Sequence, residues 1–162
     1  MKRLFIVRHA KAEKNEKTSD FDRGLNVRGE NDAKLMAKVI LRTIEDPVVF
    51  VSSTAKRALQ TALIFKKAIP KAKIIENGEL YTGNSSTILQ AILSLDEKFS
   101  SAFIFGHNPA LEDFMGNAVC NARMATTSVA CFEVNADSWK EATPQDLRLV
   151  FLLRPSLFKK EK

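Results

Sequence analysis

The sequence predicts an α/β fold in which helices cover a mostly parallel sheet. Three runs contain only apolar residues, at positions 4–7, 48–51 and 102–105. Such runs are typical of central strands that are covered on both faces, as in a parallel sheet. The segments between them repeat apolar residues with the period of a helix. Strands that alternate with helices in this way favour a layered α/β fold whose neighbouring strands are parallel.

Four segments have the apolar spacing of an amphipathic helix, namely residues 33–44, 55–63, 88–95 and 111–118. We expect the second of these helices to be capped by a hydroxyl group of residues 52–54. We expect the fourth to begin with Asn108 as its cap and Pro109 at its first helical position.

Three further segments are predicted to be strands, at residues 73–75, 129–134 and 147–153. The longest loop, from Ala10 to Asn26, is rich in charged residues, and we expect it to be functional or mobile. The chain has no internal repeat and no linker long enough to divide it, and its 162 residues fit one core. We therefore expect a single domain over residues 1–162.

The composition is that of a globular protein with a basic surface. Apolar residues make up 45% of the chain, charged residues make up 27%, and the net charge is +6. A positive charge attracts phosphate groups, acidic proteins and nucleic acid alike. No apolar stretch approaches the ~20 residues of a membrane span, and the N-terminal apolar run is too short for a secretory signal. We therefore expect a cytoplasmic protein that does not act at a membrane.

The cysteines and histidines do not predict a metal site. Cys120 and Cys131 have apolar neighbours, which favours two buried, reduced thiols over a disulfide. The sequence has no CxxC, HExxH or clustered Cys and His pattern. It also lacks an aromatic-rich RNA-binding motif and a zinc finger, so nucleic acid is not an expected partner.

Polar residues follow each of the three central runs at the point where the strand is predicted to end. Arg8 and His9 follow the first run, residues 52–54 and Arg57 follow the second, and His107 follows the third. In an open parallel sheet, ligands bind outside the carboxyl ends of the strands. Because these positions include both histidines of the chain together with Arg8 and Arg57, we expect one catalytic site there rather than two structural histidines.

These residue types suit phosphoryl transfer. The transferred group spreads negative charge over three oxygens, and an arginine presents a planar fork of donors that matches this geometry. Arg57, near a helix N-terminus, would add its charge to that of the free backbone N–H groups. A neutral imidazole can attack phosphorus and form a covalent intermediate, which we assign to His9. His107 would then donate to the phosphoryl oxygens, and it would do so better when protonated.

Three motifs resemble those of the histidine phosphatase superfamily, which has the phosphoglycerate mutase-like fold. Residues 4–10 resemble its signature, in which Arg-His-Gly (the RHG motif) is the hallmark, with Ala10 in place of the glycine. Residues 52–62 resemble the second motif, whose arginine binds phosphate, and residues 106–109 resemble the third, which supplies the second histidine. The likeness runs from about Leu4 to the final strand, so we expect a single histidine phosphatase domain.

Within this superfamily the chain is most similar to the SixA-type phosphohistidine phosphatases. The similarity lies in residues 8–13 and 19–23, in Leu25, in residues 28–29 and in the short chain. Two departures are Gly24, where such relatives usually have proline, and residues 124–128, which differ from the Pro-Thr-Gly segment often found there.

The resemblance implies a three-layer α/β/α sandwich in which His9 accepts the phosphoryl group and Arg8, Arg57 and His107 form the phosphate pocket. It implies no metal and no organic cofactor. Small members lack the insertions that roof the pocket in sugar-phosphate enzymes. An open pocket would admit a phosphohistidine on the surface of a partner protein.

Three other residues have two interpretations each. Glu79 is either the counterpart of the superfamily's general acid or a surface carboxylate, and the sequence favours neither interpretation. Arg23 could reach the phosphate or pair with Asp20 or Asp22. Asn15 could donate to phosphate, although a polar loop residue is the simpler interpretation.

The sequence is also compatible with two alternative functions. One is a metal-independent phosphomonoesterase for a small metabolite or nucleotide, with Glu79 as its acid. The other is a non-catalytic phosphate-binding module that uses its basic surface. A mutase is less favoured, because holding a two-phosphate intermediate normally requires a closed pocket.

Overall fold

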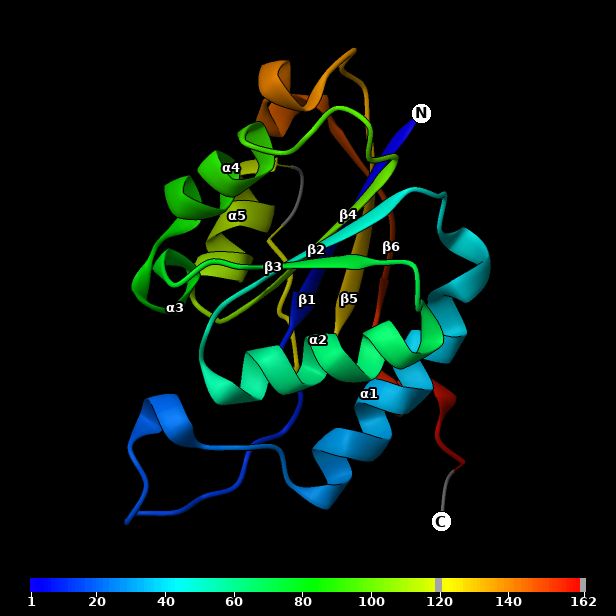
Figure 1. Cartoon of the computed structure of the whole chain (residues 1–162). Helices are drawn as coiled ribbons and strands as arrows, with labels where there is room; N and C mark the ends of the chain where they lie inside the picture. The colour runs from blue at the N-terminus through cyan, green and yellow to red at the C-terminus, as the bar shows by residue number, and fades with distance from the viewer. Residues whose placement is uncertain (119–120, 161–162) are drawn as a thin grey trace.

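The computed structural model describes residues 1–118 and 121–160 of the chain. Within these residues six strands form one sheet in the order β3-β2-β4-β1-β5-β6 (Figure 1). The strands are β1 (Lys2–Arg8), β2 (Val48–Ser52), β3 (Lys73–Glu76), β4 (Ser101–Gly106), β5 (Val129–Val134) and β6 (Leu147–Leu153). The pairs β3·β2, β2·β4 and β4·β1 are parallel, whereas β5 is antiparallel to both β1 and β6. The predicted, mostly parallel sheet is confirmed.

Helices cover both faces of this sheet. They are α1 (Val27–Ile40), α2 (Lys56–Ala68), α3 (Glu79–Thr82), α4 (Ser85–Leu93) and α5 (Ala110–Ala118). Figure 1 shows α1 and α2 on one side of the sheet and α3, α4 and α5 on the other. The fold is therefore the three-layer α/β/α sandwich that the family resemblance implied.

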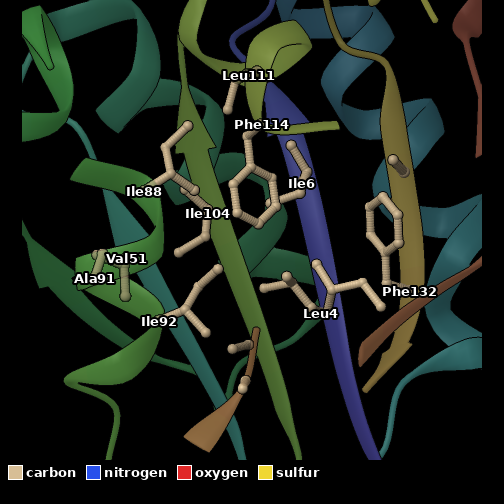
Figure 2. Close-up of a cluster of buried hydrophobic side chains, with 14 of the residues drawn as sticks. Leu4, Ile6, Val51, Ile88, Ala91, Ile92, Ile104, Leu111, Phe114 and Phe132 are labelled. Atoms are coloured by element: carbon tan, nitrogen blue, oxygen red, sulfur yellow. The ribbon is translucent and has the colours of Figure 1, made fainter. Parts of the chain in front are cut away.

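The alternation of side chains along β1 explains the two cores. Leu4 and Ile6 belong to the cluster under α4 and α5, whereas Phe5 and Val7 belong to the cluster under α1 and α2, and all four are fully buried. Figure 2 shows the first cluster, in which Phe114 of α5 packs over Ile6. Burying a side chain of this kind stabilises the fold by roughly 1.5–3 kcal/mol. A continuous apolar run is required here because the central strands have no face that reaches water.

The helix boundaries differ from the predicted ones where side chains cap the backbone. Helix α1 begins at Val27 rather than Ala33, because Oδ1 of Asn26 accepts a hydrogen bond from the backbone N–H of Gly29 at 2.8 Å. The prediction that residues 52–54 cap α2 is wrong, since the N-cap is Ala55 and has no side-chain hydrogen bond.

The predicted start of α5 is also wrong. The helix begins at Ala110, one residue beyond Pro109. The side chain of Asn108 donates through Nδ2 to Oε1 of Glu112 at 2.9 Å and to the carbonyl of Met124 at 3.0 Å, while its Oδ1 has no partner among the described residues. Asn108 therefore ties α5 to the segment before β5 instead of capping the helix.

The loop between β1 and α1 is folded back on itself. Ala12 and Leu25 form an antiparallel bridge, and residues Asp20–Asp22 form a short 3-10 helix, η1, between them. The backbone N–H of Leu25 donates to Oε1 of Gln60 on α2 at 2.8 Å. These contacts hold the loop next to the N-terminus of α2.

Two further observations concern the cysteines and the hydropathy of the helices. Cys131 is buried, it forms no disulfide among the described residues, and burial raises the pKa of its thiol to about 12. Cys120 lies outside the described residues. In the part of the chain that the structure describes, no helix has both the length and the hydropathy of a membrane span.

Candidate active site

The carboxyl ends of β1, β4 and β2 lie side by side at one edge of the sheet. Strand β4 is the middle one of the three, and its last residue, Gly106, is in register with Arg8. The pairing continues one residue further: the backbone N–H of His9 donates to the carbonyl of Gly106 at 3.1 Å, and that of Ser53 donates to the carbonyl of Phe105 at 3.0 Å. The structure thus brings together the polar segments that follow the three strands.

His9 is held in one tautomer by its own backbone. Its Nδ1 lies 2.8 Å from the carbonyl oxygen of Ala10, and the side chain is 9% exposed. Because a carbonyl oxygen can only accept, this contact assigns the proton to Nδ1 and the lone pair to Nε2. Burial, and then the neighbouring cationic groups, lower the pKa of His9 to about 3. His9 is therefore a neutral imidazole near pH 7, with Nε2 able to act as a nucleophile.

Arg57 lies beside this nitrogen. It is in the first turn of α2, it is 6% exposed, and its Nε donates to Nε2 of His9 at 3.4 Å. The other end of the guanidinium is held by Asp20: Nη1 donates to its backbone carbonyl at 2.7 Å and Nη2 to its Oδ2 at 3.0 Å. A fixed positive charge therefore stands where a phosphoryl group on His9 would place its oxygens.

His107 is the second histidine of the site and lies next to His9. The two ring centroids are 5.1 Å apart, and Nε2 of His107 lies 2.8 Å from Oγ of Ser53. Burial lowers the pKa of His107 to about 4, so this ring is also neutral in the phosphate-free site. Its Nδ1 is buried and has no hydrogen-bond partner among the described residues. A buried polar atom of this kind is an open position for a ligand oxygen.

Arg8 is anchored from the segment before β5. Its Nη1 donates to the carbonyl of Met124 at 2.9 Å, while its buried Nε has no partner in the described part of the chain. The backbone N–H of Thr127 reaches the carbonyls of Arg8 and His9 at 3.1 and 3.2 Å. Thr127 has a φ of 64°, a left-handed conformation that a threonine seldom adopts. Residues 124–127 therefore hold the end of β1 in place from outside the strand.

Asp20 and Tyr81 form one wall of the site. The hydroxyl of Tyr81 donates to Oδ2 of Asp20 at 2.6 Å, and the Tyr81 ring meets His107 edge-on with centroids 5.6 Å apart. Hydrogen bonds from Tyr81 and then from Arg23 and Arg57 hold the pKa of Asp20 well below its usual range, so the carboxylate stays ionised. The same hydrogen bond raises the pKa of Tyr81.

The comparisons with known proteins point to one family. Residues 4–81 match the sequence model of the Histidine phosphatase superfamily (branch 1). SixA from Agrobacterium tumefaciens, described as a candidate phosphohistidine phosphatase, is 28% identical and superimposes with a TM-score of 0.80 over 95% of this chain and 98% of that chain. A search of curated proteins found no match.

Two further SixA structures share the fold. The SixA from Nakamurella multipartitia, also described as a candidate phosphohistidine phosphatase, gives a TM-score of 0.83 at 21% identity, over 95% of this chain and 96% of that chain. The protein histidine phosphatase SixA complexed with tungstate gives 0.78 at 21% identity, over 97% of this chain and 99% of that chain.

The first half of the chain thus matches the Histidine phosphatase superfamily, and the whole chain shares the fold of the SixA structures. The superfamily's hallmark glycine is Ala10 here. Ala10 is fully buried, its N–H donates to Oγ1 of Thr61 at 2.9 Å, and its φ is not positive. An L-residue therefore fits this position without backbone strain. Gly24, the other departure, lies where a Cβ would meet the flexible side chains of Gln60 at 3.1 Å and Lys56 at 3.3 Å.

The remaining predicted residues lie around the superfamily pocket without joining it directly. Arg23 pairs with Asp20, through Nε at 3.2 Å and Nη2 at 2.8 Å to Oδ1, which is one of its two predicted roles. Glu79 is exposed at the first residue of α3, with no side-chain hydrogen bond or ion pair recorded for it in the described structure. Asn15 accepts from the backbone N–H of Lys17 at 3.0 Å, as a polar loop residue does.

Sequence reasoning missed the roles of Ser53, Tyr81 and Thr127. The hydroxyl of Ser53 meets both Nε2 of His107 and the backbone N–H of Ala55, so it belongs to the site as well as to the start of α2. Tyr81 and Thr127 carry no sequence pattern that separates them from ordinary loop and helix residues, and only the fold brings them to the site. Within the described residues, no group of three or more His, Cys, Asp or Glu side chains is arranged to hold a metal ion.

Proposed function

We propose that the protein is a phosphatase that accepts a phosphoryl group on Nε2 of His9 and hydrolyses it. The observation that carries this proposal is the environment of His9. Its Nδ1–H is bonded to the carbonyl of Ala10, and its unprotonated Nε2 faces the guanidinium of Arg57 at 3.4 Å. A neutral nucleophile next to a fixed cation is the arrangement that phosphoryl transfer through a covalent intermediate needs.

The reaction would proceed in two displacements. In the first, Nε2 of His9 forms a bond to phosphorus while the bond from phosphorus to the leaving group breaks, and the leaving group takes up a proton from solvent. In the second, water forms a bond to phosphorus, the P–Nε2 bond breaks, and a proton from the water passes to solvent. The products are inorganic phosphate and the free imidazole of His9.

Three groups would stabilise the charge on the phosphoryl oxygens in both displacements. Arg57 would exchange its contact with Nε2 of His9 for a contact with an oxygen. Arg8 and His107 each present a buried nitrogen that has no partner among the described residues, Nε and Nδ1 respectively. Donors that are already in place when charge develops are the largest single contribution in reactions of this kind.

We propose phosphohistidine on a protein as the substrate. The similarity to the Agrobacterium SixA, which covers 95% of this chain and 98% of that one, supports this choice. The chemistry supports it as well, because an imidazole is easier to expel than an alkoxide and needs no dedicated acid. Glu79 is exposed, and its side chain makes no hydrogen bond or ion pair among the described residues. We further propose that the reaction needs no metal or organic cofactor and takes place in the cytoplasm.

A paired turnover assay tests this function. Wild type and His9→Ala would be given phosphohistidine on a small carrier protein and, separately, p-nitrophenyl phosphate, both with EDTA present. We expect wild type to release phosphate from phosphohistidine and His9→Ala to release none. Loss of turnover in EDTA, restored by a divalent metal, would contradict metal independence. Turnover of neither substrate would favour a phosphate-binding module without catalysis.

A phosphomonoesterase for a small metabolite or nucleotide is the second candidate. The observation that favours it is the position of Glu79, which begins the same helix turn that brings Tyr81 to Asp20. Glu79→Gln would lower ester hydrolysis at least tenfold if this carboxyl protonates the leaving oxygen. Glu76→Gln, which alters an exposed carboxylate at the end of β3, is the matched control. Equal activity of the two variants on the ester would remove Glu79 from the mechanism.

A further inference from the structure

Asp20 is the residue on which the polar side chains of the site converge. Its Oδ2 accepts from Nη2 of Arg57 at 3.0 Å and from the hydroxyl of Tyr81 at 2.6 Å. Its Oδ1 accepts from two nitrogens of Arg23, and its backbone carbonyl accepts from Nη1 of Arg57 at 2.7 Å. The carboxylate therefore connects the loop before α1 with the first turns of α2 and α3.

The way in which Asp20 holds Arg57 leaves one edge of the guanidinium for the phosphoryl group. A guanidinium can offer a pair of donors end-on, from its two Nη atoms, or side-on, from Nε and one Nη. Asp20 engages both Nη atoms, one with its carbonyl and one with its carboxylate. Nε, in contrast, points to Nε2 of His9. The side-on edge, which includes Nε, thus faces the nucleophile, while Asp20 binds the two Nη atoms at the end of the guanidinium.

We propose that Asp20 is a positioning residue that turns the Nε edge of Arg57 toward the phosphoryl group on His9. This inference rests on the proposed function, since it assigns a role within the same site. Asp20 acts through Arg57 and does not itself contact the reacting atoms. Arg23 neutralises the second carboxylate oxygen and also donates to the carbonyl of Glu13 at 3.1 Å, which ties the loop that carries Asp20 in place.

Tyr81 extends this arrangement to the second histidine. Its hydroxyl is bonded to Asp20, its ring meets that of His107 edge-on, and the guanidinium carbon of Arg57 lies 5.9 Å from the ring centroid. The edge of Phe21, the residue after Asp20, packs against the same ring with centroids 5.1 Å apart. Asp20 and Tyr81 together therefore fix the spacing between Arg57 and His107.

The direction in which oxyanion affinity changes when Asp20 loses its charge distinguishes a positioning role from a simple charge effect. The side chain of Asp20 is 55% exposed and carries a negative charge at the edge of an anion site. If it acted only through that charge, removing it would strengthen the binding of any oxyanion. If it positions Arg57, removing the charge weakens oxyanion binding, because a loosened guanidinium no longer presents a preorganised edge.

The experiment measures tungstate binding by calorimetry, together with kcat and KM for phosphohistidine, in Asp20→Asn. We expect the Kd for tungstate to rise about tenfold and kcat to fall at least tenfold. The matched control is Asp22→Asn, in the same short helix, whose carboxylate accepts from Oγ of Ser19 at 2.7 Å. That variant should keep the wild-type Kd within about twofold.

A second variant distinguishes a local effect on the site from a general loss of structure. Tyr81→Phe removes only the hydroxyl that donates to Asp20 and should raise the Kd for tungstate in the same direction, by about threefold. Tungstate binding that is unchanged or tighter in Asp20→Asn would overturn the proposal, as would an equal loss in Asp22→Asn. Tungstate binding needs no turnover, so the two proposals can fail separately. A wild type that binds tungstate but hydrolyses nothing would refute the proposed function. The role of Asp20 would still be decided by the Kd for tungstate of Asp20→Asn against that of Asp22→Asn.

Discussion

Oγ of Ser53 lies 2.8 Å from Nε2 of His107, and the same oxygen accepts from the backbone N–H of Ala55 at 3.2 Å. Since the hydroxyl already accepts from Ala55, its proton is available to His107. We expect Nε2 of His107 to be the acceptor of this hydrogen bond, which places the ring proton on Nδ1, the buried atom without a partner in the described structure. In this tautomer His107 can donate to a phosphoryl oxygen even while the ring is neutral.

Ser53→Ala should lower kcat for phosphohistidine about tenfold, because it removes the hydrogen bond that selects the Nδ1–H tautomer. Steady-state kinetics on the purified variant measure this. Ser52→Ala is the control, since Ser52 is equally buried and its hydroxyl donates only to the carbonyl of Ser53 at 2.9 Å. If both variants lost the same activity, the effect would come from packing and not from the tautomer.

Both histidines should remain neutral well below the ordinary histidine pKa. Burial, the largest cause for each, lowers the pKa of His9 to about 3 and that of His107 to about 4. The chain has two histidines, so proton-detected NMR of their ring carbons gives two signals to follow. We expect neither signal to shift between about pH 8 and pH 5, whereas both should titrate near pH 6.5 in urea. A midpoint above pH 6 in the folded protein would contradict the proposed neutral nucleophile.

The same shifts predict how stability depends on pH. Both folded-state pKa values are lower than the unfolded-state value of 6.5, so below pH 6.5 the unfolded chain binds more protons than the folded one. The free energy of unfolding should therefore fall as the pH drops from about 6.5 toward 4, by up to about 1.4 kcal/mol per pH unit for each histidine. Urea unfolding at about pH 7, 6 and 5 measures this slope. The double variant His9→Gln, His107→Gln should show a flatter profile, and an unchanged slope would assign the effect to other groups.

Gly29 should be intolerant of any side chain. A Cβ at this position would overlap the carbonyl oxygen of Lys11, where α1 crosses the loop after β1. We expect Gly29→Ala to lower the free energy of unfolding by about 1–3 kcal/mol, as overpacking of a buried contact does. Gly78→Ala is the control, because a Cβ there meets only Oγ1 of Thr54 at an ordinary 3.5 Å. Chemical denaturation of the two variants should separate them; similar values would show that the loop moves aside freely.

Much of the fold followed from local patterns. The apolar runs at residues 4–7, 48–51 and 102–105 each became a buried strand, because a strand covered on both faces needs apolar residues at every position. Helix starts were less predictable. The start of α1 depends on the side chain of Asn26 meeting Gly29, whereas α2 begins after Ala55, whose side chain cannot cap a helix.

The placement of the candidate site followed from the same patterns. His9, Arg57 and His107 lie at the carboxyl ends of parallel strands, and the order of strands and helices brings such ends to one edge of the sheet. Arg23 illustrates the limit of this reasoning. The position of Arg23 in the loop after His9 allowed either phosphate or a nearby carboxylate as its partner. The fold of that loop directs its guanidinium to Asp20.

The sequence by itself determined the α/β class, the strand positions and the residue types at the strand ends, because these depend on periodicities of a few residues. Tertiary structure alone decided which nitrogen of each histidine faces the pocket and which edge of Arg57 is presented. The hydrogen bonds that orient Arg57 come from Asp20, which also binds Tyr81. Arg57 and Tyr81 are 37 and 61 positions away from Asp20 along the chain. Contacts over such distances depend on how the loops close once both cores have packed, and no local pattern of residues encodes that closure.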